Sequence, residues 1–183
     1  TPSHNEKVKG MIDVREYEQL ALETGAYRDI ELDILGETLE VWKERPGQPY
    51  TLVEIRDGKQ LAGFCLYHKA QATEYTYDIH TLAVGRDYRG KGVGTRLVEL
   101  VRDEIVTREP YGIIRSETSK AKERAIEPGF YEANGFETIG HIPDFYENEN
   151  DYYIYARAAT RAEAPLEGEP GAESAADGTG SES

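Results

Sequence analysis

The sequence predicts an α+β (α/β) fold in which helices flank a mixed, mostly antiparallel central sheet of about seven strands. Two observations support this prediction. Asp57-Gly58 joins two strand-like segments, which is the pattern of a tight antiparallel hairpin. After that hairpin, strand-like and helix-like segments alternate, and such an order favours a sheet covered by helices. Residues 1–158 have the length of a single domain with a core of its own.

The first half of the chain is expected to hold a strand, two helices, the two strands of the hairpin and a longer strand: Val8–Val14, Glu16–Gly25, Asp33–Glu44, Tyr50–Arg56, Gln60–His68 and Glu74–Val84. The longer strand is dense in aromatic and β-branched residues, and it leads directly into a glycine-rich loop. The second half is expected to begin with an amphipathic helix that has five apolar residues on one face: Val93, Leu97, Leu100, Val101 and Ile105. A strand, a further helix and two final strands are expected to follow: Tyr111–Glu117, Lys122–Ala133, Phe136–His141 and Asp151–Arg157.

Three glycines, Gly90, Gly92 and Gly94, alternate along the loop between the longer strand and the amphipathic helix. Glycines let a backbone approach a phosphate without interference from Cβ atoms, and free N–H groups at the start of a helix attract an anion. We therefore expect the loop to bind phosphate, and a glycine-rich turn without a ligand is the alternative. Arg89 and Lys91 either add positive charge there or are solvated side chains.

Two common phosphate-binding motifs do not fit this loop. Gly85 to Lys91 matches the first seven positions of a Walker A loop, but Gly92 stands where the motif needs Ser or Thr to hold magnesium. The dinucleotide fingerprint GxGxxG fails because Thr95 or Leu97 stands at its third glycine. The pattern that does fit is Arg89-x-x-Gly92-x-Gly94, preceded by a strand and followed at once by a helix.

With Tyr131-Glu-Ala-Asn-Gly-Phe136 following in the expected order, nearly all of residues 8–158 resembles the GNAT superfamily of acyl-coenzyme A-dependent N-acetyltransferases. The motifs are most similar to those of ribosomal-protein alanine acetyltransferases. The resemblance implies that the loop holds the diphosphate of acetyl-CoA, that acetyl transfer is direct and needs no metal, and that a backbone N–H near Ala83 or Val84 holds the acetyl carbonyl, where the strand bulges. The implied cofactor-binding residues are Leu82, Ala83, Val84, Arg89, Gly90, Lys91, Gly92, Val93, Gly94, Thr95 and Lys122.

An amine attacks a thioester only when it is neutral, so a general base is useful, and three side chains are candidates. Asp78 and His80 share one face of a strand. Asp78 matches the glutamate base of histone-type acetyltransferases, and His80 matches one of two histidines of serotonin N-acetyltransferase. Glu117 matches the base of the alanine acetyltransferases and ranks first, because Ala125-Ile126 follow at the distance seen in that group. The structural alternatives are a solvent-facing aspartate, a packed core histidine and a salt-bridged glutamate.

Tyr131 matches the tyrosine that protonates the departing thiolate in this family, and a core aromatic residue is the alternative. Two differences from the alanine acetyltransferases affect its position. The chain has two more residues between Ile126 and Tyr131, including Pro128-Gly129, so the helix that bears Tyr131 is expected to start later or to bend. Lys122 stands where that group commonly has an asparagine. Aromatic residues of the final hairpin are expected either at the acceptor entrance or in the sheet packing: Phe145, Tyr146, Tyr152 and Tyr153.

The formal net charge is −14, from 35 acidic and 21 basic residues, which disfavours nucleic acid and anionic membranes as partners. Cys65 is the only cysteine, and no apolar run approaches the ~20 residues of a membrane span, so we expect a soluble, cytoplasmic protein. The widely spread acidic residues favour a halophilic source over an ordinary acidic enzyme. Residues 159–183 are polar and lack aromatic residues, and are expected to form a disordered acidic tail.

The favoured acceptor is a protein amine, with an N-terminal α-amine ahead of lysine, because Asp144–Tyr153 resembles the last loop and strand of the alanine acetyltransferases. A small polyamine or amino sugar is the alternative acceptor. Outside the enzyme class, the alternative is a non-catalytic module that senses acyl-CoA. A homodimer is compatible with the sequence.

Overall fold

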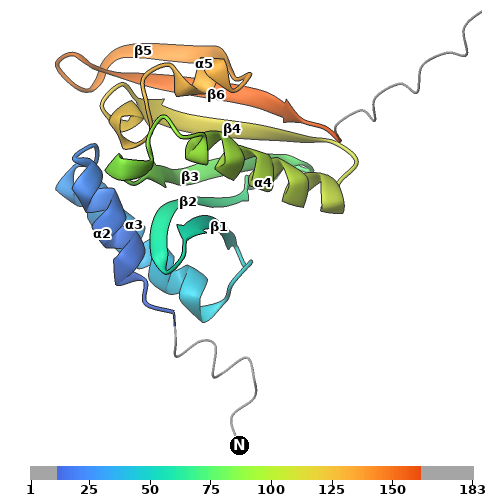
Figure 1. Cartoon of the computed structure of the whole chain (residues 1–183). Helices are drawn as coiled ribbons and strands as arrows, with labels where there is room; N and C mark the ends of the chain where they lie inside the picture. The colour runs from blue at the N-terminus through green and yellow to red at the C-terminus, as the bar shows by residue number, and fades with distance from the viewer. Residues whose placement is uncertain (1–11, 162–183) are drawn as a thin grey trace, which may run out of the picture.

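The computed structural model describes residues 12–161 of the chain. Six strands form one sheet in the order β1-β2-β3-β4-β6-β5, and all neighbouring pairs are antiparallel except β3–β4, which is parallel. The strands are β1 Tyr50–Asp57, β2 Gln60–Lys69, β3 Thr76–Val84, β4 Gly112–Ser119, β5 Glu137–Glu147 and β6 Asn150–Ala159. Figure 1 shows this sheet with β5 and β6 at one end and β1 at the other. The predicted fold class is confirmed, with six described strands instead of about seven.

The missing strand is the one predicted over Val8–Val14. Ile12 and Asp13 have no regular structure, and Val14 is the N-cap of the first described helix, while residues 8–11 lie outside the described residues. Val14 is buried in the core beside that helix. For Ile12–Val14 the strand prediction was therefore wrong, because the apolar side chains of Ile12 and Val14 anchor a helix start.

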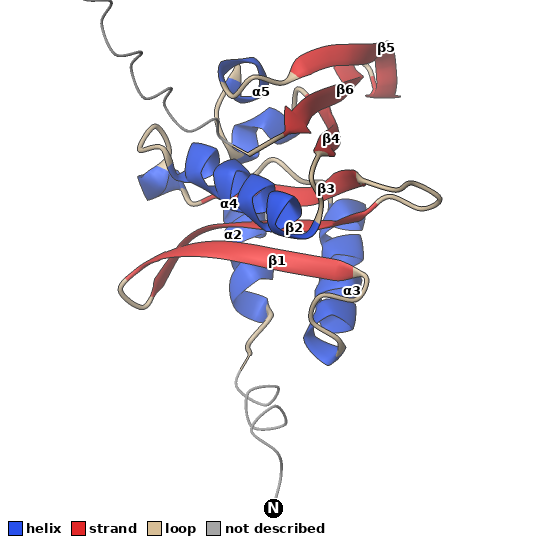
Figure 2. Ribbon diagram, turned by 90° about the vertical axis from the view of Figure 1, so that its right-hand side faces the viewer, coloured by secondary structure: helices blue, strands red, loops and turns tan. Residues whose placement is uncertain are grey.

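The helices pack on opposite faces of the sheet. They are α2 Arg15–Thr24, α3 Asp29–Glu44, α4 Val93–Arg108 and the short α5 Phe130–Ala133, with 3₁₀ turns at η1 Arg86–Tyr88 and η2 Lys122–Ala125. Side chains alternate along β2, so Phe64 packs with α2 and α3, whereas Cys65 packs with α4. Figure 2 shows α4 on one side of β1–β3, and α2 and α3 on the other.

Local sequence signals explain where two helices begin and end. Gly25 ends α2 with a left-handed backbone (φ +66°), as its position predicts. Helix α3 begins four residues before the predicted Asp33, because the Glu31 carboxylate accepts a hydrogen bond from the backbone N–H of Arg28 (2.9 Å) and caps the first turn.

The single helix predicted over Lys122–Ala133 is instead two short pieces. Residues 122–125 form η2, and α5 begins only at Phe130. Pro128 lacks an N–H for a helical hydrogen bond, and Gly129 has a left-handed backbone (φ +73°), so the two residues interrupt the helix. The late start expected for the helix with Tyr131 is confirmed.

Candidate active site

The parallel pair β3–β4 opens into a gap towards the carboxyl ends of its strands. Pairing runs from Thr76 opposite Ile113 to Ile79 opposite Ser116 and stops there. Side chains from both strands and from three other segments line a small cavity in this gap: Tyr27, Ile79, His80, Thr81, Leu82, Ser116, Glu117, Thr118, Lys122 and Tyr131. Three of the four predicted catalytic side chains, Glu117, Tyr131 and His80, therefore lie around one cavity, which Asp78 does not line.

A β-bulge at His80 sets which backbone groups of β3 face the gap. Thr81 pairs with Leu66 and Ile79 with Tyr67, so His80 is the extra residue. The sequence had placed the bulge near Ala83 or Val84, which is wrong by three to four residues. The bulge changes the alternation of the strand: Ile79 and, three residues later, Leu82 both belong to the core on the α4 side.

Backbone hydrogen bonds alternate between the two edges of an antiparallel strand. The N–H of Gly85 donates to the carbonyl of Ala62 in β2 (2.9 Å), so Ala83 and Thr81 also direct their N–H and C=O groups towards β2. The N–H and C=O groups of Leu82 and Val84 must then face the gap. Two amides were predicted to hold the acetyl carbonyl. The amide of Val84 faces the gap, whereas the amide of Ala83 faces β2. The amide of Leu82 also faces the gap.

The glycine loop leads from the gap to the start of α4. Gly90 and Gly92 have left-handed backbones (φ +67° and +78°) that other residues rarely adopt, and a Cβ at either position would point into open space. The backbone N–H of Arg89 donates to Arg86, and that of Arg96 donates to the carbonyl of Gly92 (3.0 Å). Between these two residues, no backbone N–H donates to another described residue. The amides from Gly90 to Thr95 are thus available to an anion.

A second cavity adjoins these amides and continues from the Val84 end of β3. It is lined by Val84, Tyr88, Arg89, Gly90, Gly92, Val93, Gly94, Thr95, Ile126, Glu127 and Phe130. Arg89 donates from Nε to the carbonyl of Val84 (3.4 Å), while its buried Nη2 has no hydrogen-bond partner among the described residues. Burial lowers the pKa of this guanidinium. An unpaired buried cationic nitrogen beside a row of free amides fits a diphosphate group.

Gly94 has a packing role beside its place at the cavity, whereas the side chain of Lys91 lies away from the cavity. A Cβ at Gly94 would lie 2.8 Å from Cε2 of Phe130, so this glycine permits close packing of α4 against α5. Lys91 does not line the cavity, and its Nζ lies over the ring of Tyr88, 5.7 Å from the centroid.

Tyr131 reaches the gap from the α4 and α5 side. Its hydroxyl lies 2.9 Å from Oγ of Ser116, and its ring stacks on Tyr155 with centroids 4.5 Å apart and planes 9° apart. Burial raises the pKa of Tyr131, so the phenol keeps its proton at neutral pH. A fixed, protonated hydroxyl at the edge of the gap is a proton donor to whatever lies there.

Glu117 lies on the opposite face of β4 from Ser116, because neighbouring strand residues alternate. Its carboxylate is 47% exposed and lies 3.5 Å from Nη1 of Arg115. The same arginine holds Asp78 by two short hydrogen bonds, Nε to Oδ1 (2.7 Å) and Nη2 to Oδ2 (2.8 Å). Asp78 is therefore committed to a bidentate pair, whereas Glu117 keeps most of its hydrogen-bonding capacity.

His80 is on the α2 and α3 side of the sheet with both ring nitrogens in contact with hydroxyls. Nδ1 lies 2.8 Å from Oγ1 of Thr81, and Nε2 lies 3.4 Å from Oγ1 of Thr38. Burial, with the positive charge of Lys122 and a neighbouring histidine, lowers the pKa of His80 to about 4. The ring is neutral at pH 7 and is a weak base.

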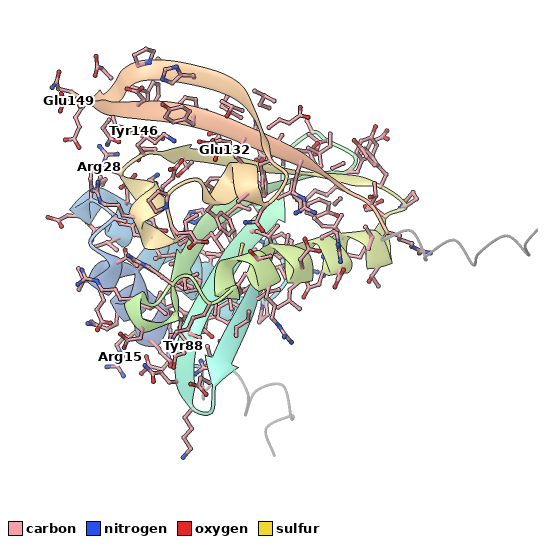
Figure 3. The ribbon with its side chains drawn as sticks, turned by 45° about the horizontal axis from the view of Figure 1, so that its top comes forward. Arg15, Arg28, Tyr88, Glu132, Tyr146 and Glu149 are labelled. Atoms are coloured by element: carbon pink, nitrogen blue, oxygen red, sulfur yellow. The ribbon has the colours of Figure 1, made fainter. Side chains whose placement is uncertain are left out.

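Charged and aromatic side chains surround the gap on this second face. The ammonium of Lys122 lies 2.7 Å from Oε1 of Glu31, which also accepts from Arg28 (3.4 Å). Both cations lie over the ring of Tyr146, at 5.4 Å for Lys122 and 5.1 Å for Arg28. Figure 3 shows Arg28 and Tyr146 next to each other, where the β5–β6 hairpin meets the helices α2 and α3.

No local sequence pattern indicates three residues of this site. Tyr27 lies in a connection between helices, Ser116 is a single serine in a strand, and Tyr155 occurs in a hairpin with many tyrosines. Within residues 12–161, no three His, Cys, Asp or Glu side chains converge as metal ligands would, and none of the helices has the length and apolarity of a membrane span.

An opened pair of parallel strands with an anion-binding loop at one end defines a domain that holds an extended, phosphate-bearing ligand. Residues 12–136 match the acetyltransferase (GNAT) family, and the chain belongs to this family. The class of the domain is that of an acetyl-CoA-dependent acetyltransferase, as the sequence predicted. An uncharacterised protein of Mycobacterium leprae is 37% identical over 109 residues, which are 58% of this chain and 29% of that protein. The chain thus spans less than a third of this relative.

Solved structures share the fold. A protein described as a GNAT-family acetyltransferase from Desulfovibrio desulfuricans is 25% identical, with a TM-score of 0.71 over 81% of this chain and 93% of that one. An aminoglycoside 6'-N-acetyltransferase complexed with coenzyme A is 18% identical, with a TM-score of 0.62 over 81% and 91%. The ribosomal-protein-S18-alanine N-acetyltransferase from Escherichia coli is 21% identical, with a TM-score of 0.53 over 69% and 80%.

Proposed function

We propose that this protein transfers the acetyl group of acetyl-CoA to a primary amine, with a protein N-terminal α-amine favoured over lysine as the acceptor. The observation that supports it is the distribution of groups around the gap. Tyr131 reaches the gap from the α4 and α5 face, whereas Glu117, His80 and Lys122 line it from the α2 and α3 face. A proton donor on one face and candidate proton acceptors on the other therefore meet at the gap between β3 and β4.

Bound acetyl-CoA supplies the activated thioester. The amides of Gly90 to Thr95 and the buried Nη2 of Arg89 hold the diphosphate, which places the rest of the donor along the Val84 end of β3. The amides of Leu82 and Val84 face the gap and are positioned to stabilise negative charge that develops on the acetyl oxygen.

Glu117 is the proposed general base. It lines the cavity and is half exposed, so it can accept a proton from an ammonium group and release it to water. Asp78 is held by Arg115, and His80 is a weak base with both nitrogens in contact with hydroxyls. These contacts support Glu117 as the general base ahead of Asp78 and His80.

Tyr131 is the proposed general acid. Its hydroxyl keeps its proton at neutral pH and is fixed by Ser116 and by the stack on Tyr155. Protonation of the departing sulfur by this phenol, as the C–S bond breaks, lets coenzyme A leave as the neutral thiol.

A thiol-release assay over a panel of amines tests the proposal. The panel contains peptides with a free α-amine, peptides with only a lysine amine, a polyamine and an amino sugar, since the structural relatives include enzymes named for both protein and aminoglycoside acceptors. We expect the α-amine peptides to react fastest. A small-molecule acceptor that reacts at least tenfold faster would replace the protein acceptor, and tight acetyl-CoA binding without release for any amine would favour the sensor.

Three further proposals concern the protein in its cell. We propose a cytoplasmic location because Cys65 is a single, buried cysteine, and a halophilic source because the net charge is −14. A homodimer is proposed as a state that the sequence allows. Thermal unfolding measured against KCl concentration tests the halophilic source: stability should rise in molar salt. Light scattering tests the dimer.

A further inference from the structure

Tyr27 closes the side of the gap that faces α2 and α3. It comes from the connection between these helices, packs against their core and reaches the cavity beside Leu82. Its hydroxyl donates to the carbonyl of Leu82 (3.2 Å). That carbonyl lost its strand partner where β4 diverges, so the tyrosine satisfies a backbone group that would otherwise be unpaired.

This hydrogen bond fixes the tyrosine ring in place. The ring is packed at its base against the helices and held at its tip by the sheet edge. Burial raises the pKa of Tyr27, so the hydroxyl remains a donor at neutral pH. A movement of the ring away from the gap would break the contact and leave the carbonyl unpaired, which makes Tyr27 a rigid wall.

The acyl group of a bound donor must lie against this wall. The diphosphate site is beyond the Val84 end of β3, so the donor enters the gap from that end. Its sulfur must lie within reach of the Tyr131 hydroxyl, on the α4 and α5 face. The acyl carbon next to the sulfur then projects towards the other face, where Tyr27, His80 and Lys122 stand.

We infer that Tyr27 restricts the donor to short acyl groups, so that acetyl-CoA is accepted and longer acyl-CoA thioesters are rejected. This inference rests on the proposed acetyl transfer. An acyl chain that is too long and meets a rigid wall binds more weakly by about tenfold or more. Butyryl-CoA, with two methylenes more than acetyl-CoA, should therefore bind at least ~10-fold more weakly.

Calorimetric titration of the full chain with CoA, acetyl-CoA, propionyl-CoA and butyryl-CoA tests the inference. Three variants accompany the wild type. Tyr27→Phe keeps the ring, Tyr27→Ala removes it, and Tyr111→Ala is the matched control, because Tyr111 is 40% exposed and precedes the opposite end of β4. If Tyr27→Ala does not fold, Tyr27→Leu removes the ring with a smaller loss of apolar surface.

We expect wild type and Tyr111→Ala to prefer acetyl-CoA over butyryl-CoA at least ~10-fold, and Tyr27→Ala or Tyr27→Leu to reduce this ratio to within about twofold. Tyr27→Phe keeps the ring but loses the hydrogen bond to the carbonyl of Leu82, so its ratio should lie between these two values. Equal wild-type affinities for the two thioesters, or an unchanged ratio in the ring-less variants, would overturn the inference while leaving acyl-CoA binding intact. A wild type that binds neither CoA nor any thioester would instead refute the proposed function, and this inference with it.

Discussion

Replacement of Tyr131 by phenylalanine removes the hydroxyl of the proposed general acid and keeps the packing of its ring. The substitution removes one oxygen atom. The ring can keep its stack on Tyr155 and its edge contacts with Phe130 and Phe136, at centroid distances of 5.4 and 5.3 Å. The contact that is lost is the hydrogen bond to Ser116, a residue that is only 2% exposed.

The two expected costs differ in kind. The unpaired, buried hydroxyl of Ser116 should lower the free energy of unfolding by about 1–3 kcal/mol. Loss of a general acid should lower kcat by about 10²- to 10⁴-fold, and the lower figure corresponds to about 2.7 kcal/mol in the activation free energy. The KM for acetyl-CoA should change little, because the diphosphate site does not include Tyr131.

The matched control is Tyr155→Phe. This variant also loses one buried phenol hydroxyl, which donates to Glu123 (3.0 Å), but that hydroxyl does not line the gap. Steady-state thiol release and urea unfolding are measured for both variants. We expect both to lose stability and only Tyr131→Phe to lose kcat. A kcat within threefold of the wild type in Tyr131→Phe would refute the role of Tyr131 as the acid.

Three further predictions concern packing, pH and the choice of base. Gly94→Ala places a Cβ 2.8 Å from the Phe130 ring and should cost about 1–3 kcal/mol in urea unfolding, together with weaker acetyl-CoA binding; unchanged stability would contradict the packing. The unfolded chain protonates His80 near pH 6.5, whereas the folded protein holds its pKa at about 4, so stability should fall as the pH drops through this window, by up to about 3 kcal/mol. The free energy of unfolding in urea is measured at pH 7 and pH 4.5 for wild type and His80→Gln, which share all other titrating groups. Wild type should lose more stability between the two pH values, and an equal loss in both proteins would contradict the prediction. Asp78→Asn disrupts the pair with Arg115 and should lower stability by about 1 kcal/mol while leaving kcat within threefold; a loss of kcat comparable to that of Glu117→Gln would make Asp78 the base.

Much of the fold could be predicted because its signals are local. The Asp57-Gly58 hairpin, the glycine loop and the apolar face of α4 each depend on residues within one turn or one helix, and the described elements follow them. The interrupted helix before Tyr131 was also visible, since Pro128-Gly129 is a local signal. The early start of α3 is local too, and Glu31 at its third position is a usual capping residue, but the N-cap is Arg28, a residue not usually associated with a helix start.

The details that shape the site depend on contacts between distant segments. The bulge at His80 leaves no pattern in the sequence, because residues on both faces of β3 are buried: Thr81 and Ala83 on one, Ile79, Leu82 and Val84 on the other. Tyr27 is 55 residues away from the carbonyl that it caps. No local rule indicates that a strand edge 55 residues later will lose its partner there.

A titration of isotope-labelled protein with acetyl-CoA, followed by ¹H–¹⁵N NMR, tests the central claim most directly. We expect the amides of Gly90 to Thr95, which have no described partner outside the helix, to show the largest changes in chemical shift, and the amides of Leu82 and Val84 to change with them. Binding that leaves the Gly90–Thr95 amides unchanged while other amides shift, or no binding at all, would refute this glycine loop as the diphosphate site.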